Sequence, residues 1–267
     1  MSKVLILDID GTLTTSDKKI TSAVRDALLD IQNRGHRIVI ASGRPTHGVK
    51  WVADALQLNR FDGYVLCFNG ARITSVTTGE VVFQQEFPSE CIEPLYNYAL
   101  QHDMGFVTYE GDRVITGTRF DAYMEFEARL NHMELVQVKD FTDYVKFPVN
   151  KCLLTAPVDL APALETELQR SYEDLLSIYR SEPYFIEAMP LGVDKAASLE
   201  HLFSLLHVDR EQTIACGDGY NDISMIRYAG VGVAMANAQE EVRQAADVVT
   251  ARTNDEDGLL EVIEEYF

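Results

Sequence analysis

The chain has 267 residues, of which 46% are hydrophobic and 24% charged, and its formal net charge at pH 7 is −19. This composition excludes the disordered and fibrous classes, and the length allows one or two domains with a sizeable core. Binding to nucleic acid or to an anionic membrane depends on lysine and arginine side chains that neutralise phosphates. The acidic balance therefore argues against both partners, and it leaves the oligomeric state open.

The amino terminus reads MSKVLILDID, in which acids follow a short apolar run without the basic region or cleavage site of a secretory signal. No segment has the roughly 20 apolar residues that a transmembrane helix requires. Cys67, Cys91, Cys152 and Cys216 are isolated and mostly lie beside apolar residues, which favours buried, reduced thiols over disulfides or a zinc site. We therefore expect a cytoplasmic protein.

Short apolar runs alternate with helical patterns over the first eighty residues, which predicts a mainly parallel sheet with helices on its faces. The expected strands are 3–7, 37–41 and 64–67, and the expected helices are 22–34 and 45–56. Residues 72–76 and 81–85 then flank the turn TTGE and predict a hairpin that leads away from the sheet.

Residues 86–186 have a different pattern, with helices and paired strands that predict an α+β insert. Its expected strands are 105–109, 112–117, 150–155, 175–180 and 184–188. The alternation of helix and strand then resumes, with helices at 195–206 and 256–266 and strands at 212–216, 231–235 and 247–250. We therefore expect an α/β core formed by two segments, 1–85 and 187–267, with the insert at 86–186 between them.

The segment DIDGTLT at 8–14 directly follows the first apolar strand, so Asp8 and Asp10 are expected at its carboxyl end, where open α/β sheets bind ligands. Two acids one residue apart can divide the work of a nucleophile and a proton carrier, and Gly11 permits a tight turn directly after them. Taken alone, the two acids could equally accept hydrogen bonds from loop amides.

The segment IASGRP at 40–45 also ends an apolar strand and precedes a helix. The Ser42 hydroxyl and free backbone amides such as that of Gly43 could bind phosphate oxygens there, because a helix N-terminus favours anions. Arg44 could add a charged contact to a phosphate or a sugar, although a loop arginine is by default solvated.

Two later segments complete the pattern. Lys195, in GVDK, begins a helix, where a lysine opposes the helix dipole but could neutralise a phosphoryl group, with a surface lysine as the plain alternative. Asp218 and Asp222, in ACGDGYND at 215–222, follow a further strand. Mg²⁺ prefers oxygen ligands, and Asp8, the backbone carbonyl of Asp10 and Asp218 could supply them.

These four segments, in this order at strand ends, resemble the four signature motifs of the haloacid dehalogenase superfamily. NGA at 69–71, SGRP, GVDK, GDGYNDISM and GVAMANA are similar to the Cof-type branch of its phosphatases. The resemblance covers both core segments and implies a Rossmannoid fold in which residues 86–186 form a cap of type C2B. Position 42 carries Ser where many Cof-type members carry Thr, and the hydroxyl is kept.

The resemblance implies a Mg²⁺-dependent phosphoric monoester hydrolase that acts on a small phosphorylated metabolite, with sugar phosphates ahead of pyridoxal or nucleoside phosphates. Asp8 would be the nucleophile that forms a phosphoaspartate, and Asp10 the general acid and base. The remaining implied roles are phosphate or substrate binding by Ser42, Gly43, Arg44, Asn69, Lys195 and Asn221, Mg²⁺ binding by Asp8, Asp10 and Asp218, and support of the metal or Lys195 by Asp222.

Three alternatives stay open. A phosphomannomutase-like enzyme has a related core and transfers the phosphoryl group to a sugar hydroxyl instead of water. A phosphate-accepting signalling module also phosphorylates an aspartate beside Mg²⁺, and a non-catalytic scaffold could keep the fold alone. Within the insert, no single candidate for substrate selection stands out among Arg113, Tyr123, Arg129, Lys151 and Arg180.

Overall fold

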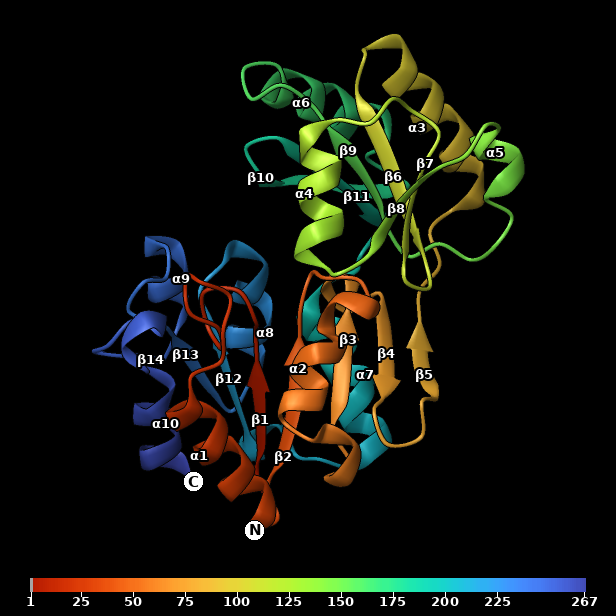
Figure 1. Ribbon diagram of the computed structural model, residues 1–267. Helices are drawn as coiled ribbons and strands as arrows, with labels where there is room; N and C mark the ends of the chain where they lie inside the picture. Colours follow the sequence, from red (N-terminus) through yellow and green to blue (C-terminus); the bar gives the residue numbers. More distant parts are fainter. Residues whose placement is uncertain (1) are drawn as a thin grey trace. The chain divides into compact units, whose positions relative to one another are not determined.

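The computed structural model describes residues 2–267 and divides into two compact units (Figure 1). The core unit comprises Met1–Gly43, Val49–Phe83 and Asp194–Phe267, and the insert unit comprises Arg44–Gly48 and Gln84–Val193. No helix within residues 2–267 is both long and apolar enough to cross a membrane. All four cysteines are buried and free, as predicted.

The core unit is built on an eight-stranded sheet in the order β14-β13-β12-β1-β2-β3-β4-β5. The strands are β1 Val4–Leu7, β2 Arg37–Ala41, β3 Tyr64–Cys67, β4 Arg72–Ser75, β5 Val81–Gln84, β12 Thr213–Gly217, β13 Val231–Ala234 and β14 Val248–Val249. The strands from β14 to β3 run parallel, and β4 runs antiparallel to β3. Strand β1 thus lies between β2, from the first third of the chain, and β12, from the last third. The predicted fold class is confirmed.

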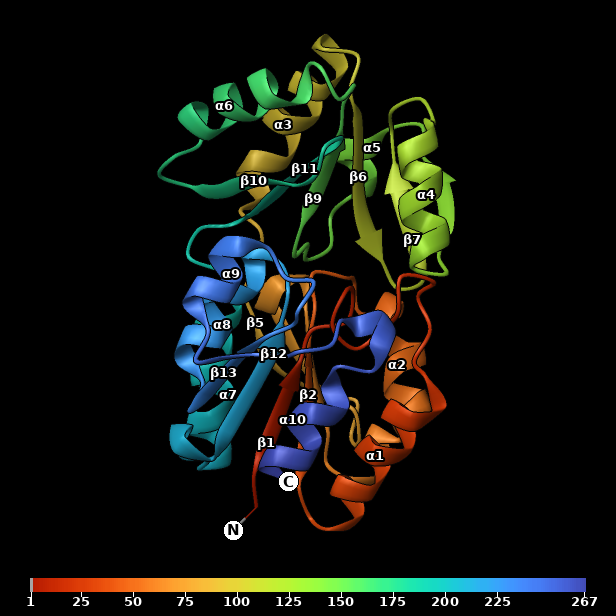
Figure 2. The same cartoon turned by 90° about the vertical axis from the view of Figure 1, so that its left-hand side faces the viewer.

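Helices cover both faces of this sheet. They are α1 Ser22–Asn33, α2 Lys50–Ala55, α7 Lys195–Leu206, α8 Ile223–Tyr228, α9 Glu240–Ala245 and α10 Leu259–Tyr266, joined by short 3₁₀ helices at 47–49, 58–60, 68–70, 210–212, 220–222 and 254–256. Figure 2 shows α7 and α8 on one side of the sheet and α1 and α10 on the other. Every residue of β1 is buried because both of its faces are covered, which explains its unbroken apolar sequence.

The insert unit contains a second sheet, of six strands in the order β10-β11-β9-β6-β7-β8. Its elements are α3 Ser89–Gln101, β6 Gly105–Glu110, β7 Arg113–Thr116, α4 Ala122–Leu130, β8 Glu134–Gln137, α5 Phe141–Tyr144, β9 Cys152–Thr155, α6 Ala161–Ser171, β10 Leu176–Glu182 and β11 Phe185–Pro190. Residues of α3, α5 and α6 form one apolar core with one face of the sheet. Helix α4 lies against the other face, since a Cβ atom on Gly105 would approach Met124 Cε to 2.3 Å.

Several predicted elements are confirmed to the residue, among them β2, β3 and α7, whereas two predictions differ from the structure and some short elements were not predicted. The hairpin does not lead away from the sheet, because β4 pairs with β3 and extends it. The helix expected at 45–56 is only α2, preceded by a 3₁₀ turn. Strand β8 and helix α9 are short and were not predicted, since their apolar patterns are weak.

The boundaries of the insert also differ from the expected 86–186. Strand β11 continues to Pro190, because it pairs with β10 up to that residue, and the unit ends at Val193. Residues Arg44–Gly48 belong to the insert unit by their contacts. A Cβ atom on Gly48 would approach Asn131 Oδ1 to 2.2 Å, so this segment lies directly against the residue that follows α4.

The insert unit buries a cluster of charged side chains beside α4. Tyr109 Oη donates a hydrogen bond of 2.7 Å to Glu127 Oε1, and Lys151 Nζ lies 3.5 Å from Glu187 Oε1. All four residues are buried. Burial raises the pKa of Glu127, and the charge of Lys151 offsets this only in part. The ionised form of Glu127 is therefore disfavoured in the folded state.

We expect Glu127→Gln to raise the free energy of unfolding at pH 7 by roughly 0.5–2 kcal/mol, the usual range for a stabilising substitution. Because the pKa of Glu127 is higher in the folded state, its protonated side chain stabilises the fold fully below the unfolded pKa of 4.5. This contribution is lost as the pH rises through the folded pKa. The gain should therefore appear in urea unfolding above pH 4.5. Glu125→Gln, on the exposed side of α4, is the control, and a loss of stability in Glu127→Gln would contradict the prediction.

Candidate active site

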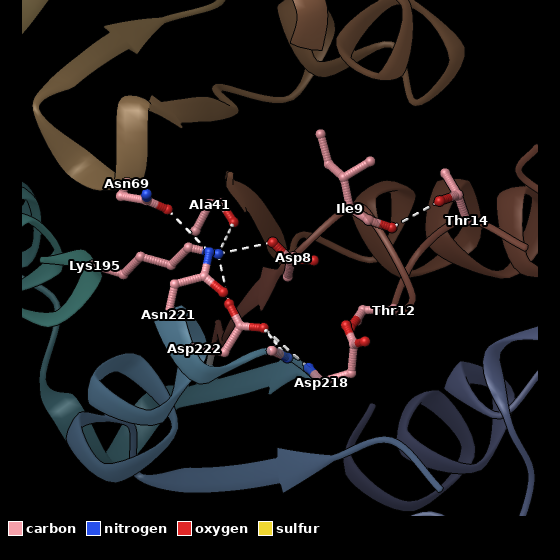
Figure 3. Close-up of polar contacts among 11 residues, drawn as sticks. Asp8, Ile9, Thr12, Thr14, Ala41, Asn69, Lys195, Asp218, Asn221 and Asp222 are labelled. Carbon is pink, nitrogen blue, oxygen red and sulfur yellow. Dashed lines mark hydrogen bonds and ion pairs between the residues drawn. The ribbon is translucent and has the colours of Figure 1, made fainter. Parts of the chain in front are cut away.

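The four motifs meet at one edge of the core sheet (Figure 3). Asp8 follows β1, Ser42 follows β2 and Asp218 follows β12, and these three strands are parallel neighbours. Their carboxyl ends therefore lie side by side, as in other open α/β sheets that bind ligands. Lys195 is the first residue of α7, whose start reaches the same edge.

Lys195 is the centre of this arrangement and is fully buried. Its Nζ atom donates to Asp8 Oδ1 at 2.7 Å, to Asp222 Oδ1 at 2.5 Å and to the Ala41 carbonyl at 2.7 Å. The three donors of the ammonium group thus each have an acceptor. Asp194 caps α7 by accepting from Ala197 N at 2.8 Å, which fixes the position of the lysine at the helix start.

The charges of Lys195, Asp8 and Asp222 depend on one another. Burial lowers the pKa of Lys195, but the carboxylates of Asp222 and Asp8 outweigh it and leave the pKa above its ordinary value. Burial raises the pKa of Asp8 well above its ordinary value, Asp222 adds to the rise, and Lys195 opposes it. The ammonium group of Lys195 is therefore the counter-charge that allows two carboxylates to lie together out of water.

Asp218 and Asp222 are held by different partners. Asp222 Oδ2 accepts hydrogen bonds from the backbone amides of Asp218 and Gly219 at 3.0 and 2.9 Å, while Thr12 Oγ1 donates to Asp218 Oδ1 at 2.9 Å. Burial, and then the charge of Asp222, raise the pKa of Asp218 to about 6. Gly11 has φ +84°, and a Cβ atom there would approach Asp218 Oδ2 to 2.2 Å, so only glycine fits between the two loops.

The carboxylates fit a hard divalent cation. One oxygen from each of Asp8, Asp218 and Asp222 lies within 4.8 Å of the others. All the donors are oxygens, the ligands that Mg²⁺ prefers. The oxygens of Asp222 are already engaged with Lys195 and two amides. Asp8 and Asp218 are therefore the two side chains best placed to hold such an ion.

The residues expected to bind phosphate lie close together beside this cluster. Asn69 donates from its backbone amide to the Ser42 carbonyl at 3.0 Å, and Asn221 Nδ2 donates to Asn69 Oδ1 at 3.0 Å. A Cβ atom on Gly43 would lie 3.1 Å from Asn69 Oδ1. Asn69 has φ +52°, a left-handed conformation that asparagine tolerates better than most residues. The structure thus brings Ser42, Gly43, Asn69 and Asn221 together.

Two predicted residues have other contacts. Arg44 is buried and donates from Nη1 to the Leu130 carbonyl at 2.9 Å, within the insert unit, so it is not a solvated loop arginine. Asp10 forms an ion pair with Lys18, whose Nζ lies 2.8 Å from Asp10 Oδ1. Thr12 and Lys18 were not predicted from the sequence. Thr12 had one indication, its position inside DIDGT, and Lys18 had none.

Comparisons with known proteins agree with this site. The profile of the family described as haloacid dehalogenase-like hydrolase matches residues 5–263. A haloacid dehalogenase-like hydrolase from Bacteroides thetaiotaomicron, solved by crystallography, is 43% identical, with all of both chains covered and a TM-score of 0.96. The HAD subclass IIB sugar phosphatase BT4131 is 26% identical over 99% of both chains, with a TM-score of 0.85.

A further relative is the 5-amino-6-(5-phospho-D-ribitylamino)uracil phosphatase YcsE of Bacillus subtilis, which is 30% identical over 98% of this chain and 94% of its own. The match extends across the core and insert segments alike, since residues 5–263 include both. The resemblance predicted from the four motifs is thereby confirmed. The chain belongs to the haloacid dehalogenase-like hydrolase family and is a phosphoric monoester hydrolase.

Proposed function

We propose that the protein is a Mg²⁺-dependent phosphatase that hydrolyses a small phosphorylated metabolite through a phosphoaspartate on Asp8. The observation that carries the proposal is the Asp8 carboxylate itself, which lies 2.7 Å from the buried Lys195 ammonium and close to Asp218 at the ligand-binding edge of the sheet. A nucleophilic carboxylate needs such a counter-charge, because it must approach a phosphate group of the same sign.

In the first step, a carboxylate oxygen of Asp8 attacks phosphorus in line with the leaving oxygen. The bond from Asp8 to phosphorus forms as the bond to the leaving oxygen breaks, and Asp10 donates a proton to that oxygen. Lys195 holds Asp8 in place and neutralises charge on the transferred group. When bound by Asp8, Asp218 and the backbone carbonyl of Asp10, Mg²⁺ supplies further stabilisation of the negative phosphoryl oxygens.

In the second step, Asp10 removes a proton from water, whose oxygen attacks phosphorus and releases inorganic phosphate, so that Asp8 is regenerated. Ser42, Gly43, Asn69 and Asn221 bind phosphate oxygens in this scheme, and Arg44 also binds substrate. Asp222 acts through Lys195, since its carboxylate accepts a hydrogen bond from the ammonium group.

We propose that the insert unit acts as a C2B-type cap that selects the leaving group, and that the enzyme works in the cytoplasm. A sugar phosphate is the substrate class best supported. BT4131 is described as a sugar phosphatase, and the substrate named for YcsE carries a phosphorylated ribityl chain.

A panel of phosphorylated metabolites, assayed by phosphate release with and without Mg²⁺, tests the proposal. We expect turnover of sugar phosphates that EDTA abolishes and added Mg²⁺ restores. Asp218→Asn should raise the Mg²⁺ concentration for half-maximal activity by at least roughly tenfold. Removing a residue that only hydrogen-bonds to a metal ligand already weakens metal binding by this factor. Because the pKa of Asp218 is about 6, protons should compete with Mg²⁺ below that pH in the wild type.

The same assay separates the alternatives. Turnover in excess EDTA would contradict the metal requirement. An isomerised sugar phosphate without release of inorganic phosphate would indicate a mutase, and a phosphorylated protein that does not turn over would indicate a phosphate-accepting module.

A further inference from the structure

The loop after Asp8, residues 9–19, is fixed to the last part of the core unit. Asn254 Nδ2 donates to the Thr14 carbonyl at 2.8 Å. Asp255 accepts from both the backbone amide and the hydroxyl of Ser16, each at 2.7 Å. The loop therefore has a defined path before any substrate binds.

A tight turn within this loop brings Lys18 close to Asp10. The Lys18 amide donates to the Thr15 carbonyl at 2.8 Å, and the Thr15 amide donates to the Lys19 carbonyl at 2.9 Å. Lys18 has φ +59°, in the left-handed region that lysine seldom adopts. In this conformation its Nζ atom reaches Asp10 Oδ1 at 2.8 Å.

The Asp10 carboxylate has neighbours that repel it. Asp8 is two residues before it, and a Cβ atom on the next residue, Gly11, would approach Asp218 Oδ2 to 2.2 Å, so two further acids lie close by. Such repulsion favours a rotamer in which the Asp10 carboxylate turns away from the other two. The ammonium group of Lys18, 2.8 Å from Asp10 Oδ1, opposes that movement.

The pair does little for the stability of the fold. The side chains of Lys18 and Asp10 are 45% and 33% exposed, and ion pairs with this much solvent contact contribute little to folding. A strained backbone that supports a weakly stabilising contact is more readily explained by a role in the reaction.

We propose that Lys18 is a positioning residue that holds the Asp10 carboxylate in the orientation required for proton transfer to the leaving group. This inference rests on the proposed function, because it takes Asp10 as the general acid. Lys18 acts through Asp10 and forms no bond to the substrate. Its contribution should therefore depend on how much the leaving group needs a proton.

Two aryl esters of similar shape measure that dependence. Phenyl phosphate releases phenol, whose pKa near 10 resembles that of tyrosine, so its departure benefits from a proton. p-Nitrophenolate leaves readily without one. We expect Lys18→Met to lower kcat/KM for phenyl phosphate by roughly tenfold, and for p-nitrophenyl phosphate by less than about twofold, since small misplacements of a catalytic group are costly.

Two further variants make the test decisive. Lys18→Arg should restore the phenyl phosphate activity, and Lys19→Met, at the exposed neighbouring lysine, should leave both esters unaffected. Equal losses on the two esters in Lys18→Met would overturn the inference, because binding or folding defects do not distinguish leaving groups.

Asp10→Asn separates this inference from the proposed function. If Asp10→Asn loses more kcat/KM on phenyl phosphate than on p-nitrophenyl phosphate and Lys18→Met does not, the role proposed for Lys18 is refuted and the proposed mechanism stands. If Asp10→Asn lowers kcat/KM equally for both esters, Asp10 is not the general acid, and the proposed mechanism fails with the inference; kcat/KM is compared because it reports formation of the phosphoaspartate and not its hydrolysis.

Discussion

Asp8→Asn should abolish turnover, with a loss in kcat of roughly 10⁴-fold or more, as expected when the nucleophile of a covalent mechanism is removed. An amide does not displace the leaving group to form an acyl phosphate, and the remaining groups bind phosphate without cleaving its ester. The measurement is Mg²⁺-dependent phosphate release from the best substrate of the panel. Substantial Mg²⁺-dependent activity in this variant would refute the phosphoaspartate mechanism.

The fold of Asp8→Asn should remain intact, so that its loss of activity reports on the reaction and not on unfolding. Lys195 keeps its contacts with Asp222 and the Ala41 carbonyl, so the buried ammonium group stays paired. Burial already raises the pKa of Asp8, and a neutral amide avoids the cost of ionising that position. Asp17→Asn, in the exposed part of the loop after Asp8, is the matched control, and urea unfolding should show both variants folded.

Lys195→Met should destabilise the protein by roughly 3–5 kcal/mol at pH 7, because it leaves two buried carboxylates without their counter-charge. Lys195 is fully buried, and Asp8 and Asp222 both accept hydrogen bonds from it. The free energy of unfolding is measured by urea titration, with the exposed Lys50→Met as the control. A variant as stable as the wild type would show that Asp8 and Asp222 do not need the ammonium group as a counter-charge.

The destabilisation should also depend on pH. Lys195 lowers the pKa of Asp8, so its removal allows that pKa to rise further above the unfolded value. A group whose folded pKa is raised stabilises the folded state when protonated, and this stability is lost as the pH rises. The difference between Lys195→Met and the wild type should therefore be smaller at pH 5 than at pH 8. Adding Asp8→Asn to Lys195→Met should recover part of the loss, which a double-mutant cycle measures.

The sequence by itself determined the strands of the core sheet and the main candidate residues of the site. Strand β1 and its neighbour β2 were predictable because both of their faces are buried, which requires unbroken apolar runs. The start of α7 was equally clear from the residues around Lys195. Because parallel strands present their carboxyl ends at one edge, Asp8, Ser42 and Asp218 could be assigned to a common site before any distance was known.

Only the tertiary structure decided which side chains meet across long stretches of chain. Strand β4 joins the sheet by pairing with β3, and Arg44 is buried against the end of α4; neither contact has a local signal. The pairing of Lys18 with Asp10 depends on a left-handed turn that is held from residues 254 and 255, more than 200 positions away. Local sequence patterns indicate burial and periodicity. The partners of a side chain that is buried or lies in a loop depend on how distant segments of the chain pack together.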